Sequence, residues 1–146
     1  KDNIKMTTLT YSTEQLEEYL ERIGCSAPGG SRLAEVKSRI HDNPLAALAD
    51  LQRLQLCAIP WGNTSMHYTQ HHTISIHPQR VFRKLVHRRL DGYCMENTNL
   101  LYIVLRSLGY QVYPTGGRVS QAAARGVDNG LYLALYVREA MRGSLY

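Results

Sequence analysis

The hydrophobic spacing changes once along the chain, near Gly109, and this change limits the possible folds more than any other feature. Before it, apolar residues recur at helical spacing, as in Leu16, Tyr19, Leu20 and Ile23. After it, residues 110–113, 117–120 and 131–137 resemble strands, and residues 126–130 supply a turn. The sequence therefore predicts an α+β protein that is helical for about two thirds of its length and then begins a sheet.

Capping residues mark where several of the helices begin and end. Ser12 and Gln15 have the spacing of a capping box, and Gly24 stands where a C-terminal cap belongs. Pro44 begins a helix that Pro60 ends, and its buried stripe is Ala47, Leu48, Leu51, Leu54 and Ala58. A weaker helix is predicted around residues 33–40.

The second half of the helical region is less regular. Residues 61–72 are predicted to form a long polar loop, and the alternation at Ile74 and Ile76 suggests a brief strand. Pro78 begins a helix with Val81, Phe82, Leu85 and Val86 inward and its basic residues outward. Another helix runs from about Cys94 to Gly109.

Composition bounds the class of protein. With 146 residues and 44% apolar side chains, the chain suits one domain of ordinary size. Its longest apolar run is far shorter than a membrane span, and no signal peptide is visible at the polar start, where Met6 is a possible natural first residue. The three cysteines form no CxxC motif, which favours free thiols in the reducing cytoplasm over a zinc or redox centre.

The net charge of +5 is concentrated in one segment. Its basic residues are Arg80, Arg83, Lys84, His87, Arg88 and Arg89. No nucleic-acid-binding motif accompanies them, so we expect a solvated helix face or a site for the phosphates of an anionic cofactor, without nucleic acid or membrane as partner.

Cys94 is the candidate nucleophile. It follows Gly92 and stands at the predicted start of a helix, where backbone N–H groups and the helix dipole favour the thiolate. Acyl transfer through a thioester needs such a thiolate, together with a base that generates it and a group that orients the base. Taken alone, a cysteine after a turn is more often a small buried hydrophobic residue.

Five motifs occur in the order known from one enzyme family. They are Tyr19 to Gly24 (YLERIG), Leu51 to Asn63 (LQRLQLCAIPWGN), Ile76 to Val86 (IHPQRVFRKLV), Gly92 to Asn97 (GYCMEN) with Leu105 to Tyr110 (LRSLGY), and Gly117 to Val119 (GRV). Together they resemble the arylamine N-acetyltransferases, over residues 11–135.

The resemblance implies a fold and a chemistry. The fold is an amino-terminal helical bundle, here residues 1–90, followed by an antiparallel β-barrel of the cysteine-proteinase-like kind. Residues 91–146 would form its nucleophile helix and first strands, an incomplete barrel. Acetyl-CoA is the implied acyl donor, an arylamine or arylhydrazine is the acceptor, and no metal takes part.

The resemblance also implies the roles of four residues. Cys94 would be the nucleophile that carries the acetyl group as a thioester. Trp61 would border the acyl pocket, Tyr93 would lie beside the nucleophile, and Glu96 would hold the site together by hydrogen bonds.

The chain departs from the family pattern in two places. The family's triad histidine and aspartate follow the nucleophile, whereas all six histidines here precede Cys94, so we expect a truncated form that is weakly active or inactive. Leu90 and Asp91 stand where the family has arginine and glycine. We expect the lost glycine to strain the turn and the lost arginine to remove an ion pair, with Arg89 one residue out of register.

Three other interpretations stay open. A non-enzymatic product would associate with another chain through the edge and exposed face of the incomplete barrel. A metal site would use His67, His71, His72 and His77, although a solvated loop explains the same residues. A papain-like thiol hydrolase has no matching signature here.

The remaining cysteines are not assigned a function. Cys57 is predicted to lie in the core, on the apolar side of its helix. Cys25 is predicted to be a surface thiol in a turn.

Overall fold

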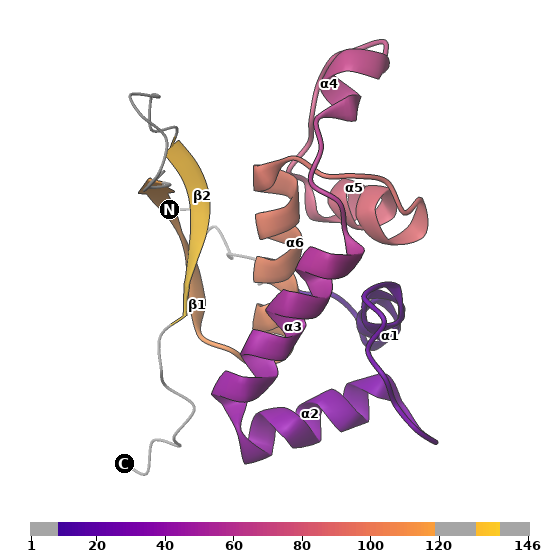
Figure 1. Cartoon of the computed structure of the whole chain (residues 1–146), viewed down its shortest axis with the longest axis vertical. Coiled ribbons are helices and arrows are strands. Elements are labelled where there is room, and N and C mark those ends of the chain that lie inside the picture. The colour runs from indigo at the N-terminus through magenta and orange to yellow at the C-terminus, as the bar shows by residue number, and fades with distance from the viewer. Residues whose placement is uncertain (1–8, 119–130, 138–146) are drawn as a thin grey trace, which may run out of the picture.

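The computed structural model describes residues 9–118 and 131–137, and Figure 1 shows their arrangement. The helices precede the strands, as the change in hydrophobic spacing predicts. The elements are α1 (Thr13–Arg22), α2 (Arg32–Asp42), α3 (Pro44–Ala58), α4 (Thr64–Tyr68), α5 (Pro78–Phe82), the π-helix η1 (Arg83–His87), α6 (Cys94–Ser107), β1 (Val112–Arg118) and β2 (Leu131–Val137).

Two helices end on the same glycine-based cap. Gly24 after α1 and Gly109 after α6 adopt φ angles of 73° and 96°, which glycine reaches without steric cost. The next N–H then points back at the helix, from Cys25 to the Leu20 carbonyl and from Tyr110 to the Leu105 carbonyl, both at 2.9 Å. The predicted caps are confirmed, and they turn the chain back toward the core.

The helices pack around α6. Figure 1 shows α3 running beside α6, with α2 across the lower end of α3 and with α1 and α5 on the far side from the strands. Apolar side chains from every longer helix fill the space between them. The fully buried ones include Tyr19, Leu20, Ile59, Val81, Phe82, Leu85, Leu100, Ile103, Val104 and Leu105.

The strands form a two-stranded antiparallel sheet that contacts α6. Val112 pairs with Val137, and the register continues to Arg118 opposite Leu131. β1 is one continuous strand where two short ones, at residues 110–113 and 117–120, were predicted; residues 119–120 and the predicted turn at 126–130 lie outside the described residues. The α+β order is confirmed, and the barrel stays a prediction, as does the division at residue 90.

The irregular segment between α3 and α6 differs from the prediction. The expected loop at residues 61–72 contains the short helix α4, and residues 73–77 form no strand. The helix that begins at Pro78 continues past Phe82 as the π-helix η1, with the four predicted apolar residues buried.

Both predictions for the remaining cysteines were wrong. Cys57 is exposed because the buried face of α3 runs through Ala47, Leu51 and Gln55, and Cys57 lies across the helix from Gln55. Cys25 is buried because it follows Gly24 in the cap, a position that normally contacts the last turn of the helix. Within the described residues, no helix is long and apolar enough to cross a membrane.

Candidate active site

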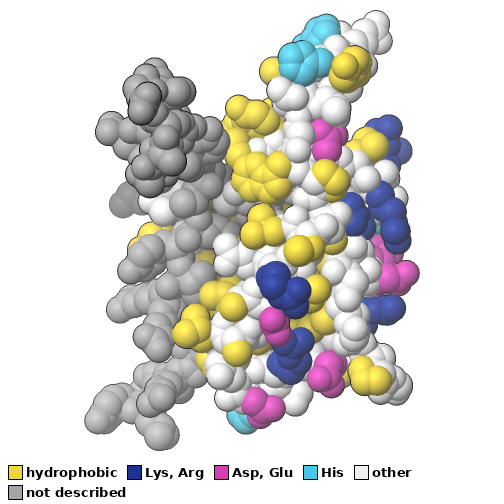
Figure 2. All heavy atoms as spheres, viewed as in Figure 1, with side chains coloured by type: hydrophobic (Ala, Val, Ile, Leu, Met, Phe, Trp, Pro, Cys, Tyr) yellow, Lys and Arg dark blue, Asp and Glu magenta, His cyan; other side chains and the backbone are white. Residues whose placement is uncertain are grey.

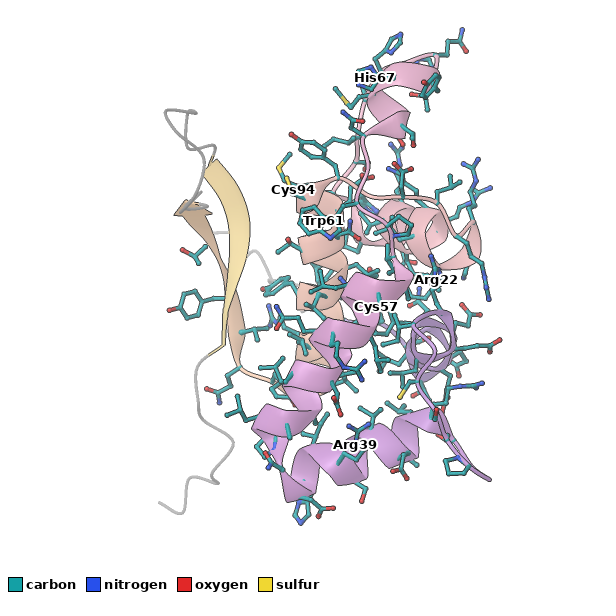
Figure 3. The ribbon with its side chains drawn as sticks, in the orientation of Figure 1. Arg22, Arg39, Cys57, Trp61, His67 and Cys94 are labelled. Atoms are coloured by element: carbon teal, nitrogen blue, oxygen red, sulfur yellow. The ribbon has the colours of Figure 1, made fainter. Side chains whose placement is uncertain are left out.

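Cys94 begins α6. Tyr93 before it has extended backbone angles (φ −69°, ψ 164°), so the thiol lies within the first turn of a helix of 14 residues. Its side chain is 8% exposed, and Figure 3 shows it at the end of α6 nearest α4. The backbone N–H groups of the first helical turn and the positive end of the helix dipole lie at this end.

Gly92 brings the segment after α3 against the start of α6. The Gly92 N–H donates to the Pro60 carbonyl, and the Gly62 N–H donates to the Gly92 carbonyl, both at 3.1 Å. Trp61 lies between Pro60 and Gly62 in the sequence and therefore pairs with Gly92 in a parallel bridge. A side chain at residue 92 would meet Leu85 and Asn97 at 2.8 and 2.9 Å, so glycine is required by the close approach.

Glu96 is buried, with 2% of its surface exposed, and its carboxylate is fully engaged. The Lys84 ammonium donates to its two oxygens at 2.8 and 2.7 Å. The Tyr93 N–H donates to Oε2 at 2.9 Å and so closes the first turn of α6. The hydrogen-bonding geometry expected of Glu96 is present, and its role in the reaction remains a proposal.

Lys84 is a site residue that the sequence analysis missed. It was grouped with the outward basic residues of the segment, yet its side chain is largely buried against Glu96. Lys84 on η1 is the cation that pairs with Glu96; the loss of an ion pair expected from Leu90 stays a prediction. The exposed residues Arg80, Arg83, Arg88 and Arg89 make no ion pair within the described part of the chain.

A chain of buried hydrogen bonds fixes the next turn of α6. The Asn97 amide donates to the Gly92 carbonyl at 2.7 Å, and the Gln55 amide donates to the Asn97 carbonyl at 3.0 Å. The Tyr19 hydroxyl donates to Gln55 Oε1 at 2.7 Å. Burial raises the pKa of Tyr19, so its hydroxyl keeps its proton and remains a donor. Gln55 and Asn97 lie on helices, and nothing in the sequence distinguishes them from polar residues at the surface.

Asp91 contacts the first residue of α4. Its carboxylate accepts from the Thr64 hydroxyl and, at 3.2 Å, from the Thr64 N–H. The Thr64 hydroxyl contributes most to lowering the pKa of Asp91, and the charge of Lys84 lowers it further. Asp91 does not adopt a left-handed φ, whereas Arg89, two residues earlier, does, with a φ of 53°.

Exposed aromatic and apolar side chains lie at the end of α6 that carries the thiol. Trp61 and Tyr93 are 53% and 41% exposed, and Met95 is also exposed. Figure 3 shows Trp61 next to the end of α6 that carries Cys94, and Figure 2 shows apolar side chains gathered on this face. The predicted residues Trp61, Tyr93, Cys94 and Glu96 thus lie at one end of α6, an arrangement suited to holding an apolar group beside the Cys94 sulfur.

No histidine reaches Cys94 within the residues that the structure describes. His87 is paired with Glu18 at 2.7 Å, and His72 contacts the Met66 carbonyl at 2.7 Å. His67 lies on α4, apart from Cys94 in Figure 3. Over the same described ranges, no three His, Cys, Asp or Glu side chains are placed to bind one metal ion.

The family model for the N-acetyltransferases matches residues 44–145 of the chain. An N-malonyltransferase of Fusarium pseudograminearum is 40% identical over 119 residues, which are 77% of this chain and 34% of that protein. The pineal gland arylamine N-acetyltransferase of Gallus gallus is 33% identical over 71% of this chain and 31% of its own length. The chain belongs to the arylamine N-acetyltransferase family.

A solved structure agrees with this assignment. The arylamine N-acetyltransferase of Salmonella typhimurium superposes with a TM-score of 0.65 at 26% identity, over 87% of this chain and 41% of that one. The resemblance predicted from the five motifs is confirmed. The chain spans about a third of the length of these curated arylamine N-acetyltransferase relatives and N-malonyltransferases.

Proposed function

We propose that this arylamine N-acetyltransferase family member is an acyltransferase in which Cys94 carries the acyl group as a thioester. The donor is an acyl-CoA, and the acceptor is the nitrogen of an arylamine or arylhydrazine. The observation that supports this proposal best is the position of Cys94 in the first turn of α6, beside exposed aromatic side chains.

The reaction proceeds in two balanced steps. The Cys94 thiolate attacks the thioester carbonyl of the acyl-CoA, the bond to the coenzyme sulfur breaks, and the coenzyme leaves as a thiolate that takes up a proton. The amine then attacks the Cys94 thioester, loses a proton, and releases the Cys94 thiolate. Trp61 and Tyr93 would pack against the aromatic acceptor, and Glu96 would keep the turn that carries the thiol in place.

The acyl group is acetyl or malonyl. The family name points to acetyl-CoA. Two relatives named N-malonyltransferases, from Fusarium pseudograminearum and Gibberella moniliformis, are 40% and 36% identical to the chain, against 33% for the Gallus gallus acetyltransferase. This order of identity favours malonyl-CoA, with acetyl-CoA as the alternative donor.

Single-turnover acylation tests the proposal. The purified chain is incubated with acetyl-CoA or malonyl-CoA, and the adduct is located by intact mass and peptide mapping. Cys94→Ser should abolish the adduct. Cys57→Ser is the matched control because Cys57 is an exposed free thiol, and it should leave the adduct unchanged. A folded protein without adduct, or an adduct that Cys57→Ser removes, would refute the proposal.

We expect acylation by the 146-residue chain alone to be slow. All six of its histidines precede Cys94, and none is bonded to the thiol in the described part of the chain. The loss of a triad member typically costs several orders of magnitude in rate. The measurement is therefore the yield of adduct over hours. The three cysteines are free, which fits the reducing cytoplasmic compartment that we propose.

A second candidate function is association with another chain. The described sheet has two strands, so each has an outer edge that no other described strand covers. Such an edge can pair with a second copy. Size-exclusion chromatography with light scattering tests this, because a monomer over a wide concentration range would rule out self-association through the edge.

A further inference from the structure

Two carboxylates flank the candidate nucleophile in the sequence. Asp91 stands three residues before Cys94, and Glu96 stands two residues after it in the first turn of α6. Glu96 is buried, and its carboxylate lies close enough to the start of α6 to accept the Tyr93 N–H. An uncompensated negative charge there would oppose formation of a second negative charge on the Cys94 sulfur.

Lys84 is the cation that pairs with Glu96. Its ammonium contacts the two oxygens of Glu96 at 2.8 and 2.7 Å, and its charge also acts on Asp91. The pair is largely shielded from solvent, so the interaction is screened far less than a surface ion pair.

The π-helix η1 delivers Lys84 to this place. The Lys84 carbonyl accepts the Leu90 N–H at 3.1 Å, which ties η1 to the segment that leads into α6. Arg22 donates to the neighbouring Leu85 carbonyl at 3.1 Å and to the Ala58 carbonyl at 2.9 Å, which joins η1 to the end of α3. Lys84 is thus held by two contacts. Its backbone carbonyl accepts from Leu90, which precedes Cys94 in the sequence, and its ammonium donates to Glu96, which follows Cys94.

We propose that Lys84 is the positioning residue for Cys94: it neutralises Glu96, keeps the first turn of α6 closed, and allows the thiolate to form at neutral pH. This inference rests on the proposed function, because it assigns a supporting role in the same acyl transfer. Lys84 acts through Glu96 and does not touch the acyl group.

Other charged or titratable groups lie on the neighbouring elements and segments. They are Arg80 on α5, His67 on α4, which lies apart from Cys94 in Figure 3, and Asp91 and Tyr93 in the segment before α6. Arg80, His67 and Tyr93 are exposed, whereas Glu96 and Lys84 are the shielded pair. The charge balance at the thiol should therefore respond most strongly to this pair.

The test is the pH dependence of Cys94 alkylation by iodoacetamide in the full chain, followed on the Cys94 peptide by mass spectrometry. Lys84→Met should raise the midpoint by about one pH unit, and Glu96→Gln should lower it. Lys84→Arg should stay within a few tenths of a unit of the unmodified chain. The double variant Lys84→Met/Glu96→Gln should return close to it, because the site is then neutral again.

Lys37→Met is the matched control, since Lys37 is an exposed lysine on α2, and it should leave the midpoint unchanged. A purely structural role for Lys84 would lower the melting temperature of Lys84→Met without moving the midpoint, and that result would overturn the inference. If Lys84→Met does not fold, an unchanged midpoint in Glu96→Gln overturns it equally. Acylation of the unmodified chain is scored separately, so failure of the proposed function shows as a missing adduct with the midpoint shifts intact.

Discussion

Replacing Gly92 by alanine tests whether the close approach at the start of α6 is as tight as the geometry indicates. The added Cβ would lie 2.8 Å from Leu85 Cδ2 and 2.9 Å from Asn97 Nδ2. Carbon atoms in good contact are separated by about 3.5 to 4.0 Å, so both neighbours must move. The leucine methyl can rotate, but the amide is held by its 2.7 Å bond to the Gly92 carbonyl.

The expected cost follows from these contacts. Overpacking a filled site costs about 1–3 kcal/mol, and weakening the Asn97 hydrogen bond adds about 1 kcal/mol. Gly92→Ala should therefore lower the free energy of unfolding by about 2–4 kcal/mol. Because the displaced residues precede and follow Cys94, single-turnover acylation should also fall.

Urea unfolding followed by circular dichroism measures the change. Gly30→Ala is the matched control, because a Cβ at Gly30 meets nothing within 4 Å and the residue lies outside the left-handed region. We expect Gly30→Ala to change the free energy of unfolding by less than about 1 kcal/mol. If the two variants unfold within about 0.5 kcal/mol of each other, the packing argument for Gly92 is refuted.

Two further predictions concern the polar contacts around the site. Tyr19→Phe leaves Gln55 Oε1 without its donor, and it should lower the free energy of unfolding by about 1–3 kcal/mol in a denaturant titration; no change would show that water replaces the hydroxyl. Thr64→Val removes the main cause of the lowered pKa of Asp91. A lowered carboxyl pKa stabilises the folded state at pH values above the ordinary pKa of about 4, and this stabilisation is lost as the pH falls through the lower pKa of the folded state. Thr64→Val should therefore cost a few tenths of a kcal/mol at pH 7 and progressively less below about pH 4. A cost that does not depend on pH would contradict the link to Asp91.

Local signals in the sequence predicted the helix ends well. The capping box at Ser12 and Gln15 is present, with Ser12 Oγ accepting the Gln15 N–H at 3.3 Å and Gln15 Oε1 accepting the Ser12 N–H at 3.1 Å. Gly24 and Gly109 end their helices as expected. These caps depend on residues within one helical turn of each other, so the local sequence is nearly sufficient to predict them.

The face of α3 was harder to predict because one of its buried residues is polar. Apolar spacing placed Cys57 in the core, yet the helix buries Gln55, which bonds to Tyr19 and to the Asn97 carbonyl. A glutamine is ordinarily a surface residue, and only partners from α1 and α6 make its burial favourable. Those partners lie 36 and 42 residues away, beyond the reach of any periodicity argument.

The same reasoning separates the parts of the site that could be predicted from the part that could not. Cys94, Tyr93 and Glu96 lie within one turn of a helix start, so one short motif of the family resemblance contains all three. Lys84 sits in a run of basic residues whose other members face solvent, and a regular α-helix from Pro78 gave no reason to single it out. The π-helical turn of η1 and the Leu90 N–H bond set its position, and π-helical turns are frequent at functional sites. A charge within a π-helical turn, 12 residues before a buried carboxylate, is therefore the kind of site residue that requires the three-dimensional structure.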